Sequence, residues 1–557
     1  MTERILVAVA WPYANGSIHL GQIAGAYLPA DVFARYHRLK GNDVLMVSGS
    51  DQHGTPITVR AEREGRPPKE IADRYHEEFL DSWRKFGISF DLFTTTDTPN
   101  HHQVAQDFFL ALKEKGYIYR ETTALLYCPS CSRFLPDRYV EGTCPYCNYQ
   151  GTRGDQCDGC GKPLNPVELI DPYCGICSST PEVRESEHFF LRLSAFNDQL
   201  IEWVKKHKHW RQNVFNFTVS FLTEGLKDRA ITRDIQWGIP VPVPGFEDKR
   251  IYVWFEAVIG YLSASMEWAQ RGGDQERWRD FWQAEAKSYY FIGKDNIPFH
   301  TIIWPAMLMG HGGLNLPYDV PANEFLTLEG RQLSTSRNWA IWLPEYLERY
   351  DPDPLRFFLS VSMPEGGDSD FSWREYVRRN NDELVATYGN LVHRVLTFIQ
   401  RNFDGSVPHH NEFDEPSSAL LRKSSDTLDS IGGALAACRF REAIRSAMGL
   451  AQEVNRYLDD KAPWKRIKED RQDAGTSLFV ALSVISCLKT VLYPFLPFSS
   501  ERLHHLLGLE GTLQDAGWAI GALTPGKPLP RPEPLFTKLD DSVVTEETAR
   551  LEQSRAG

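Results

Sequence analysis

The sequence predicts an α/β domain with a parallel sheet that is split by a metal-binding insertion and followed by an all-α helical bundle. Three observations support this prediction. Apolar strand patterns alternate with helical patterns before residue 117, which is typical of a parallel sheet covered by helices. Eight of the ten cysteines then fall between residues 128 and 177. From about residue 376 onward, long helical patterns replace the strand patterns.

The expected elements can be placed in chain order. Apolar runs of strand length cover residues 5–10 and 44–47, and helical patterns cover 21–40, 68–86 and 100–116. After the insertion, the sheet pattern resumes at 251–254 and at 289–292. Helices expected at 383–401, 418–437, 440–458 and 477–493 predict the bundle. Residues 531–557 are expected to form a tail that packs loosely or lies back on another domain.

The composition indicates a soluble protein, with 42% hydrophobic and 24% charged residues. No stretch approaches the roughly 20 apolar residues that span a bilayer, so we expect no membrane partner. The apolar start lacks a basic leader and a cleavage site, which favours a buried strand over a signal peptide and a cytoplasmic location. A net charge of −13 argues against a general nucleic-acid binder but does not exclude a specific RNA partner.

The cysteines form four C-x-x-C pairs, a spacing that lets both thiolates of a pair face one tetrahedral ion. Four pairs supply two closed sites, so we predict two structural zinc ions. The nine residues between Cys147 and Cys157 favour one site from the two inner pairs and a second from the two outer pairs; sequential or interleaved groupings stay open. The ligands are Cys144, Cys147, Cys157 and Cys160 for the first site, and Cys128, Cys131, Cys174 and Cys177 for the second.

The segment after the first strand has the pattern of a phosphate site. Residues 11–22 pass from a strand through a turn with proline and glycine to the start of a helix, where the free N–H groups receive phosphate. There, His19 could donate to a phosphate oxygen, and Gly21 would let a nucleotide approach the backbone. A helix start with a capping histidine explains the same four letters, H-L-G-Q, equally well.

Several longer segments resemble one family. They are PYANGSIHLG at 12–21, SDQHGTP at 50–56, YVWFEAVIGY at 252–261, FIGKD at 291–295 and IWPA at 303–306. In this order they are similar to motifs of the methionyl-tRNA synthetases, which are class I aminoacyl-tRNA synthetases. The resemblance implies a Rossmann-type catalytic domain in two halves (1–116 and 231–325), a connective insertion with zinc knuckles (117–230), a K-M-S-K-S-type loop with a stem-contact region (326–375), a helical anticodon-binding domain (376–530) and a C-terminal tail (531–557).

The resemblance also implies a two-step reaction. Methionine attacks the α-phosphate of ATP, which is accompanied by Mg²⁺ bound chiefly through the phosphates. The methionyl-adenylate then passes its methionyl group to the 3′-terminal adenosine of methionine tRNA, initiator or elongator, and AMP leaves. The ATP-binding residues implied by the motifs are His19, Gly21, Gln22, Gly293, Asp295 and Thr335.

The second class I signature, K-M-S-K-S, departs from the family here. Gln332 and Thr335 replace its two lysines, and Gln22 replaces the last histidine of H-I-G-H. The loop's positive charge stabilises the developing pyrophosphate in the family, and Arg331 and Arg337 could supply it here. The implied catalytic set is His19, Gln22, Arg331, Gln332, Ser334, Thr335, Ser336 and Arg337. The alternative is a catalytically impaired relative that still binds tRNA.

The methionine pocket follows from the substrate's flexible apolar stem and weakly accepting sulfur. Such a substrate needs aromatic walls and one donor, which Tyr13, Trp254 and Tyr261 would supply, with the Tyr261 hydroxyl as donor; Asp51 would pair with the ammonium group. The remaining residues implied by the resemblance are Ala10, Ala257, His300 and Trp11, whose backbone N–H would lie near the sulfur. The family often has leucine in place of Trp11. Core packing is the alternative for Trp254 and Tyr261.

The helical region resembles the family's anticodon reader. Asn390 and Arg394 lie four residues apart on one helix face. Asn455, Pro463 and Trp464 resemble a second anticodon element, in which Trp464 would stack on a base; a packing role is the alternative. The chain stops soon after a segment like the family's final linker, without the appended dimerising domain of some relatives, so we expect a monomer.

Two other classes fit less well. Synthetases for valine, isoleucine or leucine carry a large editing insertion, whereas residues 117–230 are short and rich in cysteine. A nucleotidyltransferase that makes a dinucleotide shares the sheet and the H-x-G-H motif, but it would leave the zinc insertion and the helical domain without a use.

Overall fold

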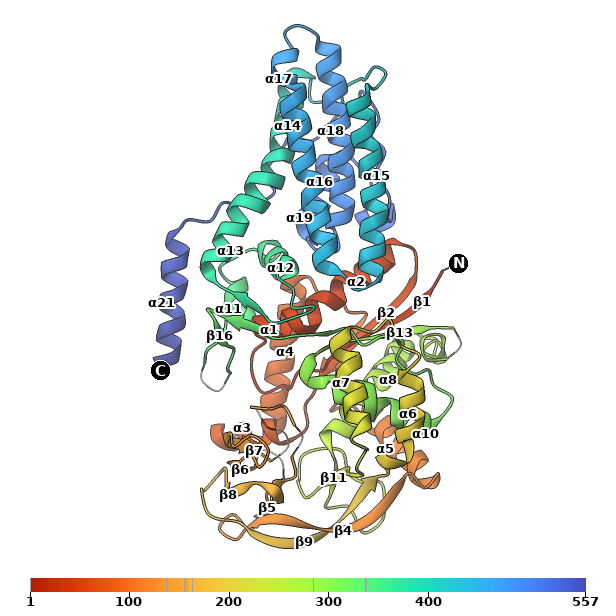
Figure 1. The fold of residues 1–557 in the computed structure, drawn as a ribbon, viewed down its shortest axis with the longest axis vertical. Helices are drawn as coiled ribbons and strands as arrows, with labels where there is room; N and C mark the ends of the chain where they lie inside the picture. The colour runs from red at the N-terminus through yellow and green to blue at the C-terminus, as the bar shows by residue number, and fades with distance from the viewer. Residues whose placement is uncertain are drawn as a thin grey trace.

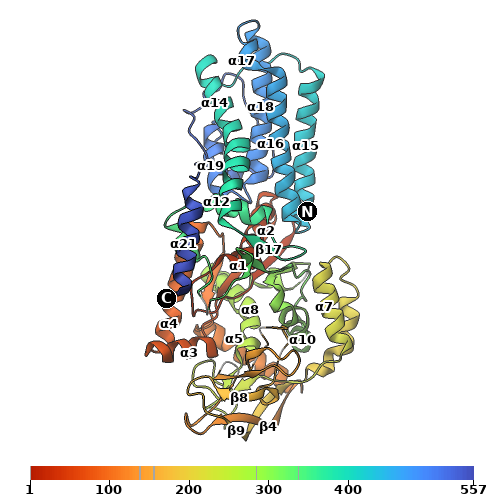
Figure 2. The same cartoon turned by 60° about the vertical axis from the view of Figure 1, so that its left-hand side comes forward.

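The computed structural model describes residues 2–136, 139–154, 157, 159–162, 164–283, 285–335 and 338–556. The molecule is elongated, with a helical bundle at one end, a parallel sheet in the middle and a β-rich lobe at the other end (Figure 1). A view turned by 60° shows the same three tiers (Figure 2).

The central sheet has the order β14-β13-β1-β2-β3, and all its neighbouring strands are parallel. Ile5–Val9 of the middle strand are fully buried. The strand order reverses between β1 and β13, and ligands bind at such switch points, outside the carboxyl ends of the strands. The strands are β1 Arg4–Val9, β2 Asp43–Ser50, β3 Leu92–Thr95, β13 Lys287–Gly293 and β14 Ala322–Asn323.

Helices connect and cover these strands. A continuous helical segment consists of α1 Leu20–Gln22, the π-helix η1 Ile23–Tyr27 and α2 Leu28–Leu39, which confirms the helix predicted at 21–40. The predicted second and third helices are also present, as α4 Pro68–Phe86 and α5 Pro99–Glu114.

One helix of this region was not predicted, α3 Thr55–Glu64. Its first half holds Ile57, Thr58 and Val59, β-branched residues that favour strands. Burial of Ile57 and Ala61 on one face decides for the helix here.

The strand expected at 251–254 was wrong. The structure has only the two-residue strand β12 Arg250–Ile251, paired with β11 Thr232–Arg233, and the helix α8 Val253–Arg271 begins directly after it. A short apolar run is equally compatible with a buried strand and with the start of a buried helix. Because α8 packs on β2 and β3, its apolar start serves helix burial.

The insertion is built on two long antiparallel strands, β4 Ile118–Cys128 and β9 Glu182–Leu191, at the lower end of Figure 1. The cysteine-rich segment lies between these strands and returns to the sheet through helices. Between the two strands lie β5 Arg133–Phe134, β6 Val140–Thr143, β7 Gln150–Arg153, η3 Pro166–Glu168 and β8 Ile170–Cys174. After β9, the chain continues through η4 Leu193–Phe196, α6 Asn197–Val204, α7 Gln212–Thr223 and β10 Arg229–Ala230.

The remaining elements join the sheet to the bundle. They are α9 Arg279–Trp282, η5 Lys294–Asn296, η6 Phe299–Ile303, α10 Trp304–His311, β15 Leu326–Leu328, β16 Arg331–Gln332, α11 Leu343–Leu347, α12 Pro352–Val361, β17 Ser369–Phe371 and α13 Trp373–Arg379. The bundle follows as η7 Asn380–Gly389, α14 Asn390–Asn402, α15 Glu415–Ala436, α16 Phe440–Lys461, α17 Pro463–Arg466, α18 Arg471–Leu492, α19 Pro497–Leu506 and α20 Leu513–Ala516.

Helix α18 corrects one expectation from composition. Among the described residues it is the single helix long and apolar enough to cross a membrane, although no such stretch was expected. Its apolar window is 89% buried inside the protein, where it packs against α15 and α16. Its hydrophobicity therefore serves the core of the bundle.

The C-terminal tail lies back on the body of the molecule. Helix α21 Ser542–Ala556 packs against α13. Its buried Glu547 receives both a two-pronged ion pair from Arg349, at 3.0 and 3.1 Å, and a hydrogen bond from the Tyr350 hydroxyl at 2.8 Å. The tail was expected either to pack loosely or to lie back on another domain, and the structure has the second arrangement.

A fully buried ion pair joins the tiers. Arg356 of α12 donates to the Asp31 carboxylate of α2 at 2.6 Å and to the carbonyl oxygens of Phe495 and Pro494, at 2.7 and 3.0 Å, which follow α18. Burial opposes the charge of Asp31, but Arg35 and Arg356 outweigh it and hold the pKa of Asp31 at about 2.

We predict that Arg356→Met lowers the free energy of unfolding by about 3–5 kcal/mol, because it leaves buried carbonyls without their donor and removes one of the two arginines that pair with the buried Asp31 carboxylate. Denaturant unfolding followed by circular dichroism measures this. Arg374→Met, at an exposed position of α13, is the control and should stay within about 0.5 kcal/mol. Equal stability of the two variants would contradict the role of Arg356.

Candidate functional site

The H-L-G-Q segment caps the first helix at the carboxyl end of β1. Nδ1 of His19 accepts the N–H of Gly21 at 3.1 Å, and Oε1 of Gln22 accepts the N–H of His19 at 3.0 Å. Burial lowers the pKa of His19 to about 4, so the ring is neutral at physiological pH. With Nδ1 used as an acceptor, Nε2 carries the hydrogen and remains available as a donor.

The second signature lies directly opposite. A Cβ at Gly21 would come within 2.7 Å of Leu333 Cδ1, so the absence of a side chain at Gly21 lets the two signatures approach. Backbone bonds from Leu20 to Ile341 (3.2 Å) and from Leu343 to Ile18 (2.7 Å) join the segments that flank the signatures. The structure therefore brings together two motifs more than 300 residues apart in the sequence.

The second signature begins at a tight hairpin. Glu329 and Gly330 both have positive φ, at 48° and 71°, and connect β15 to β16. Arg331 and Gln332 form β16 and are exposed, with the Arg331 guanidinium 5.2 Å from the Trp339 ring centroid. Ser334 pairs with Trp339 through two backbone bonds, and Thr335 is exposed. Ser336 and Arg337, also predicted for this loop, lie outside the described residues.

The predicted methionine-site residues gather at the carboxyl ends of β1 and β2. The rings of Tyr13 and Trp254 meet edge to face at 6.1 Å, and Trp254 stacks on Phe299 at 4.0 Å. Ala10 lies at the end of β1, where its carbonyl accepts the Tyr27 hydroxyl. Ala257 and Tyr261 come from α8, and His300 comes from η6.

Trp11 occupies the position where the family often has leucine, and glycines make room for it. A Cβ at Gly260 would lie 2.8 Å from the Trp11 ring, and one at Gly49 would clash with the same ring. The indole meets Tyr261 edge to face at 6.4 Å. The larger residue therefore packs into the space that two positions without side chains leave.

The Tyr261 hydroxyl has a defined partner. Nδ1 of His300 lies 3.0 Å from the Asn296 carbonyl, which can only accept, so Nε2 is the acceptor of the Tyr261 hydroxyl at 2.7 Å. Burial lowers the pKa of His300 to about 4 and raises that of Tyr261, which keeps both groups neutral. The hydroxyl hydrogen therefore points to His300 in this structure.

A buried charge network surrounds Asp51. The Asp51 carboxylate accepts the backbone N–H of His53 at 3.3 Å, and His53 Nδ1 lies 2.9 Å from Glu256 of α8. Burial and the negative charge of Glu256 raise the pKa of Asp51 well above its ordinary value. Burial opposes a charge on His53, but Glu256 and Asp97 raise its pKa to about 10. A cationic group next to Asp51 would relieve this excess of carboxylates.

The end of β13 forms the other side of the switch point. Gly293 closes the strand, and a Cβ there would lie 2.7 Å from Asp295 Oδ1. Lys294, between them, pairs with Glu324 at 2.7 Å and Asp368 at 2.9 Å. Gly293 and Asp295 thus lie on the β13 side of the switch point. The segment that follows β1 and leads to His19 lies on the other side.

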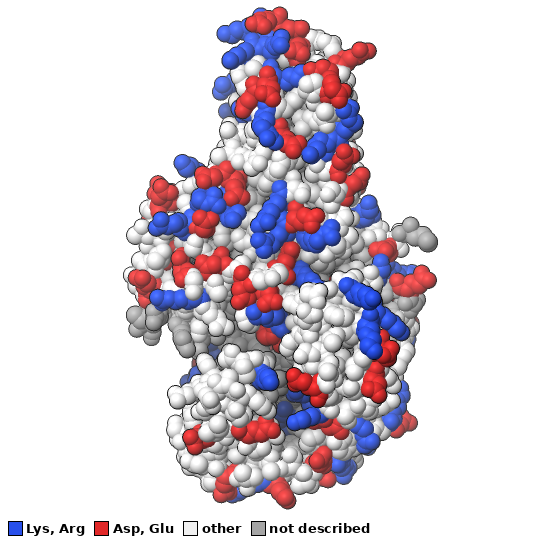
Figure 3. Space-filling model, in the orientation of Figure 1, with Lys and Arg blue, Asp and Glu red and all other residues white. Residues whose placement is uncertain are grey.

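A cavity of about 860 Å³ opens beside the aromatic walls, between the insertion and α8. Trp254 and Phe299 line it from one side and Phe217 from the other. In the space-filling view, the surface is hollowed between the insertion and the part of the molecule that holds α8 (Figure 3). Arg233, which the sequence analysis missed, also lines the cavity and lies 3.7 Å from the Tyr252 ring centroid. Its signal in the sequence was the charged pair Arg233–Asp234, in a segment that also holds the charged residues 227–229.

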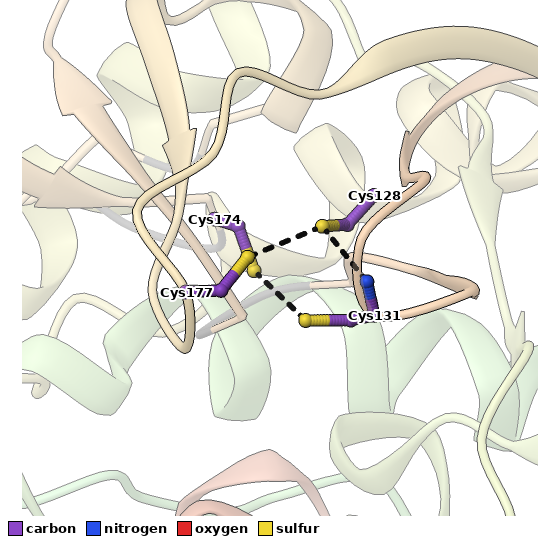
Figure 4. Close-up of side chains that lie close together, drawn as sticks. All are labelled: Cys128, Cys131, Cys174 and Cys177. Atoms are coloured by element: carbon purple, nitrogen blue, oxygen red, sulfur yellow. Dashed lines mark hydrogen bonds between the residues drawn. The ribbon is translucent and has the colours of Figure 1, made fainter.

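The structure groups the eight thiols in the two sets that the spacing favoured. In the outer set, Cys128 and Cys177 are 3.5 Å apart and Cys131 and Cys174 are 3.9 Å apart, sulfur to sulfur (Figure 4). In the inner set, the Cys147 and Cys157 sulfurs are 3.6 Å apart. Bonds of about 2.3 Å to a tetrahedral zinc place sulfurs about 3.8 Å apart. Both clusters fit structural zinc sites, and all ten cysteines are free thiols.

The backbone of the four knuckles follows one pattern. The residue after each C-x-x-C pair has a left-handed conformation, with φ between 51° and 70°: Ser132, Asn148, Gly161 and Ser178. Backbone N–H groups also point at the sulfurs, such as Gly159 to Cys157 at 3.3 Å and Cys131 to Cys128 at 3.4 Å. Donors aimed at sulfur favour the thiolate form that binds zinc.

The residues predicted to read an anticodon meet at the far end of the bundle. Arg394 of α14 donates to Asn455 of α16 at 3.2 Å, and its guanidinium lies 4.8 Å from the Trp464 ring centroid. Pro463 starts α17, and Asn390 is exposed at the start of α14. The tip of the bundle carries charges of both signs on the face in Figure 3.

Comparisons with known proteins agree with this geometry. A parallel sheet with paired signatures at its switch point defines a class I aminoacyl-tRNA synthetase, and the family model described as tRNA synthetases class I (M) matches residues 5–396. The model of the anticodon binding domain of methionyl tRNA ligase matches residues 407–556. The chain belongs to the methionyl-tRNA synthetase family.

Individual relatives match over nearly the whole chain. The methionine–tRNA ligase of Dehalococcoides mccartyi is 61% identical over 551 residues, which cover 99% of this chain and 100% of the relative. That of Thermomicrobium roseum is 56% identical and covers 99% of both chains. The solved structure of Mycobacterium tuberculosis methionyl-tRNA synthetase in complex with methionyl-adenylate has a TM-score of 0.81 at 27% identity, covering 96% of this chain and 100% of that one.

We predict that Cys144→Ser removes one zinc ion per chain and leaves the outer site loaded, because the two clusters share no ligand. Elemental analysis of chelator-washed protein should give two zinc ions for the unmodified chain and one for the variant. Cys438→Ser, at a buried cysteine of the helical region, should retain both. Loss of both ions from Cys144→Ser would show that the clusters are not independent.

Proposed function

We propose that this chain is a methionine–tRNA ligase that joins methionine to AMP at the expense of ATP and then transfers it to the 3′ adenosine of methionine tRNA. The approach of the two signature motifs at Gly21 and Leu333 carries this proposal, because ATP would be held between them. The family match over nearly the full length supports the choice of methionine.

The first step needs positioning and charge stabilisation, and no protein nucleophile. We assign His19 Nε2 and Gln22 to the phosphates, Gly293 and Asp295 to the ribose, and ATP brings Mg²⁺ bound chiefly through its phosphates. Thr335 and the other loop residues would close over the pyrophosphate. Asp51 would hold the methionine ammonium, which supplies the cation that its carboxylate-rich surroundings favour.

We further propose that the protein is a cytoplasmic monomer. The zinc ions serve structure alone, since four thiolates leave no open position on either ion. They hold the knuckles at the end of β4 and β9, next to the cavity that leads to the aromatic walls.

The test of the function is ATP–pyrophosphate exchange with each amino acid in turn. Exchange with methionine alone would support both the reaction and the pocket. A folded, zinc-loaded sample that shows no exchange but binds tRNA would identify the impaired relative that the missing signature lysines left open.

Arg331 should carry part of the charge that the two lysines supply in the family. We expect Arg331→Ala to lower kcat of methionine-dependent exchange by about 10²–10³-fold, because the developing pyrophosphate loses a cation, and Arg331→Lys to retain most of it. An unchanged kcat in Arg331→Ala would transfer the role to Arg337.

Tyr261→Phe should raise KM for methionine about ten-fold while KM for ATP stays unchanged, because His300 Nε2 loses its buried donor and the pocket loses its polar group. Exchange kinetics give both constants. Tyr376→Phe, which removes a buried hydroxyl bonded to Tyr346 outside this pocket, is the control and should leave both constants alone.

Trp464→Ala should raise KM for tRNA in aminoacylation by about 10–100-fold, the cost of one lost base stack, and leave methionine-dependent exchange unchanged. Phe498→Ala, an exposed aromatic position at the other end of the bundle, should change neither. If Trp464→Ala has a normal KM for tRNA, Trp464 does not stack on a base and instead packs against Arg394.

A further inference from the structure

A third set of metal-type ligands lies outside the cysteine clusters. The side chains of His53, Asp97 and His102 place one ligand atom each within 4.8 Å of one another. They come from the loop after β2, the loop after β3 and the first turn of α5, so the carboxyl ends of neighbouring strands bring them together.

The distances fit a metal better than direct hydrogen bonds. Oδ1 of Asp97 lies 3.7 Å from His53 Nε2 and 3.5 Å from His102 Nε2, both beyond the range of a hydrogen bond. Two ligands at about 2.0–2.1 Å on a tetrahedral zinc lie about 3.3 Å apart. Small side-chain movements would therefore satisfy an ion held between the three atoms.

The ring nitrogens are prepared for such an ion. Nε2 of His102 is buried and has no hydrogen-bond partner among the described residues. His53 is 2% exposed, and its Nδ1 lies 2.9 Å from Glu256, which directs Nε2 toward Asp97. Histidines that bind metals usually donate their other N–H to a carboxylate in this way. Lys69 holds the second oxygen of Asp97 at 3.2 Å and leaves Oδ1 for the ion.

The local charge also favours a divalent cation. Asp97 and Glu256 flank His53, and Asp51 accepts its backbone N–H. Lys69 pairs with Asp97 at 3.2 Å, and His101 lies 3.4 Å from Glu256. Two imidazoles and one carboxylate suit zinc and similar transition metals, whereas Mg²⁺ prefers oxygen ligands alone.

We propose that His53, Asp97 and His102 form a third metal site, which binds Zn²⁺ with three protein ligands and one open position. It differs from the knuckles in its ligands, and the side chains of His102 and Asp97 are 30% and 17% exposed. An ion there would tie the loop that carries Asp51 to α5. The site does not depend on the function proposed above, because metal binding is measured without substrates.

The test is zinc stoichiometry in the full-length protein. After equilibration with micromolar ZnCl₂ and rapid desalting, elemental analysis should find three zinc ions in the unmodified chain and two in His102→Ala and in Asp97→Asn. His505→Ala, at an exposed histidine of α19, should keep three. Glu256→Gln should weaken the third ion about 10–100-fold, as loss of an outer-shell partner does.

Two further measurements keep the outcome decisive. Circular dichroism checks that each variant is folded. Co²⁺ added to protein that holds zinc in its two cysteine sites only should give a weak visible band without the intense charge-transfer absorption of thiolate ligands. If the unmodified chain holds two zinc ions, the proposal is wrong. A proton on His53 then occupies the space between the three side chains. Three ions in both His102→Ala and Asp97→Asn would overturn the proposal equally.

Discussion

The buried pair of Arg356 and Asp31 is the constraint on which the arrangement of the tiers depends. Its guanidinium reaches α2 of the sheet and the residues after α18 of the bundle at once. Separating these parts would leave a charge uncompensated in the interior, at a cost of several kcal/mol. Because the folded pKa of Asp31 is depressed to about 2, its contribution is complete above about pH 4 and is lost as the pH falls toward 2.

This constraint sets the relation between the two ends of the molecule. The sheet presents the H-L-G-Q helix and the residues proposed to bind methionine, such as Asp51 and Tyr261, while the bundle carries the cluster of Arg394 and Trp464 at its far tip. The tail adds a second link, because Glu547 of α21 holds Arg349 and Tyr350, and Ser554 accepts a hydrogen bond from Asn338 beside the second signature. A bound tRNA would thus meet a body whose parts are tied at several points.

Much of the fold could be predicted, since long amphipathic periods and apolar strand runs are local properties. The helices at 68–86 and 418–437 and the strand at 44–47 reflect them directly. The predictions failed where local pattern is ambiguous: Val253 starts a buried helix and not a strand, and α3 forms despite its β-branched residues. The candidate site was predicted through motifs. This approach missed single residues outside the motifs, such as Arg233, and it also missed His53 and Glu256, which lie within motifs but were given no role.

The sequence by itself determined the classes of chemistry: four C-x-x-C pairs that require tetrahedral metal, a capped helix start after a buried strand, and aromatic residues for an apolar pocket. Only the tertiary structure decided their partners. It grouped the thiols into two sets, turned the Tyr261 hydroxyl to His300, placed Gly49 and Gly260 against Trp11, and brought His53, Asp97 and His102 within reach of one ion. The physical reason is that ligand geometry, hydrogen-bond direction and burial depend on residues far apart in the chain, which local patterns do not relate.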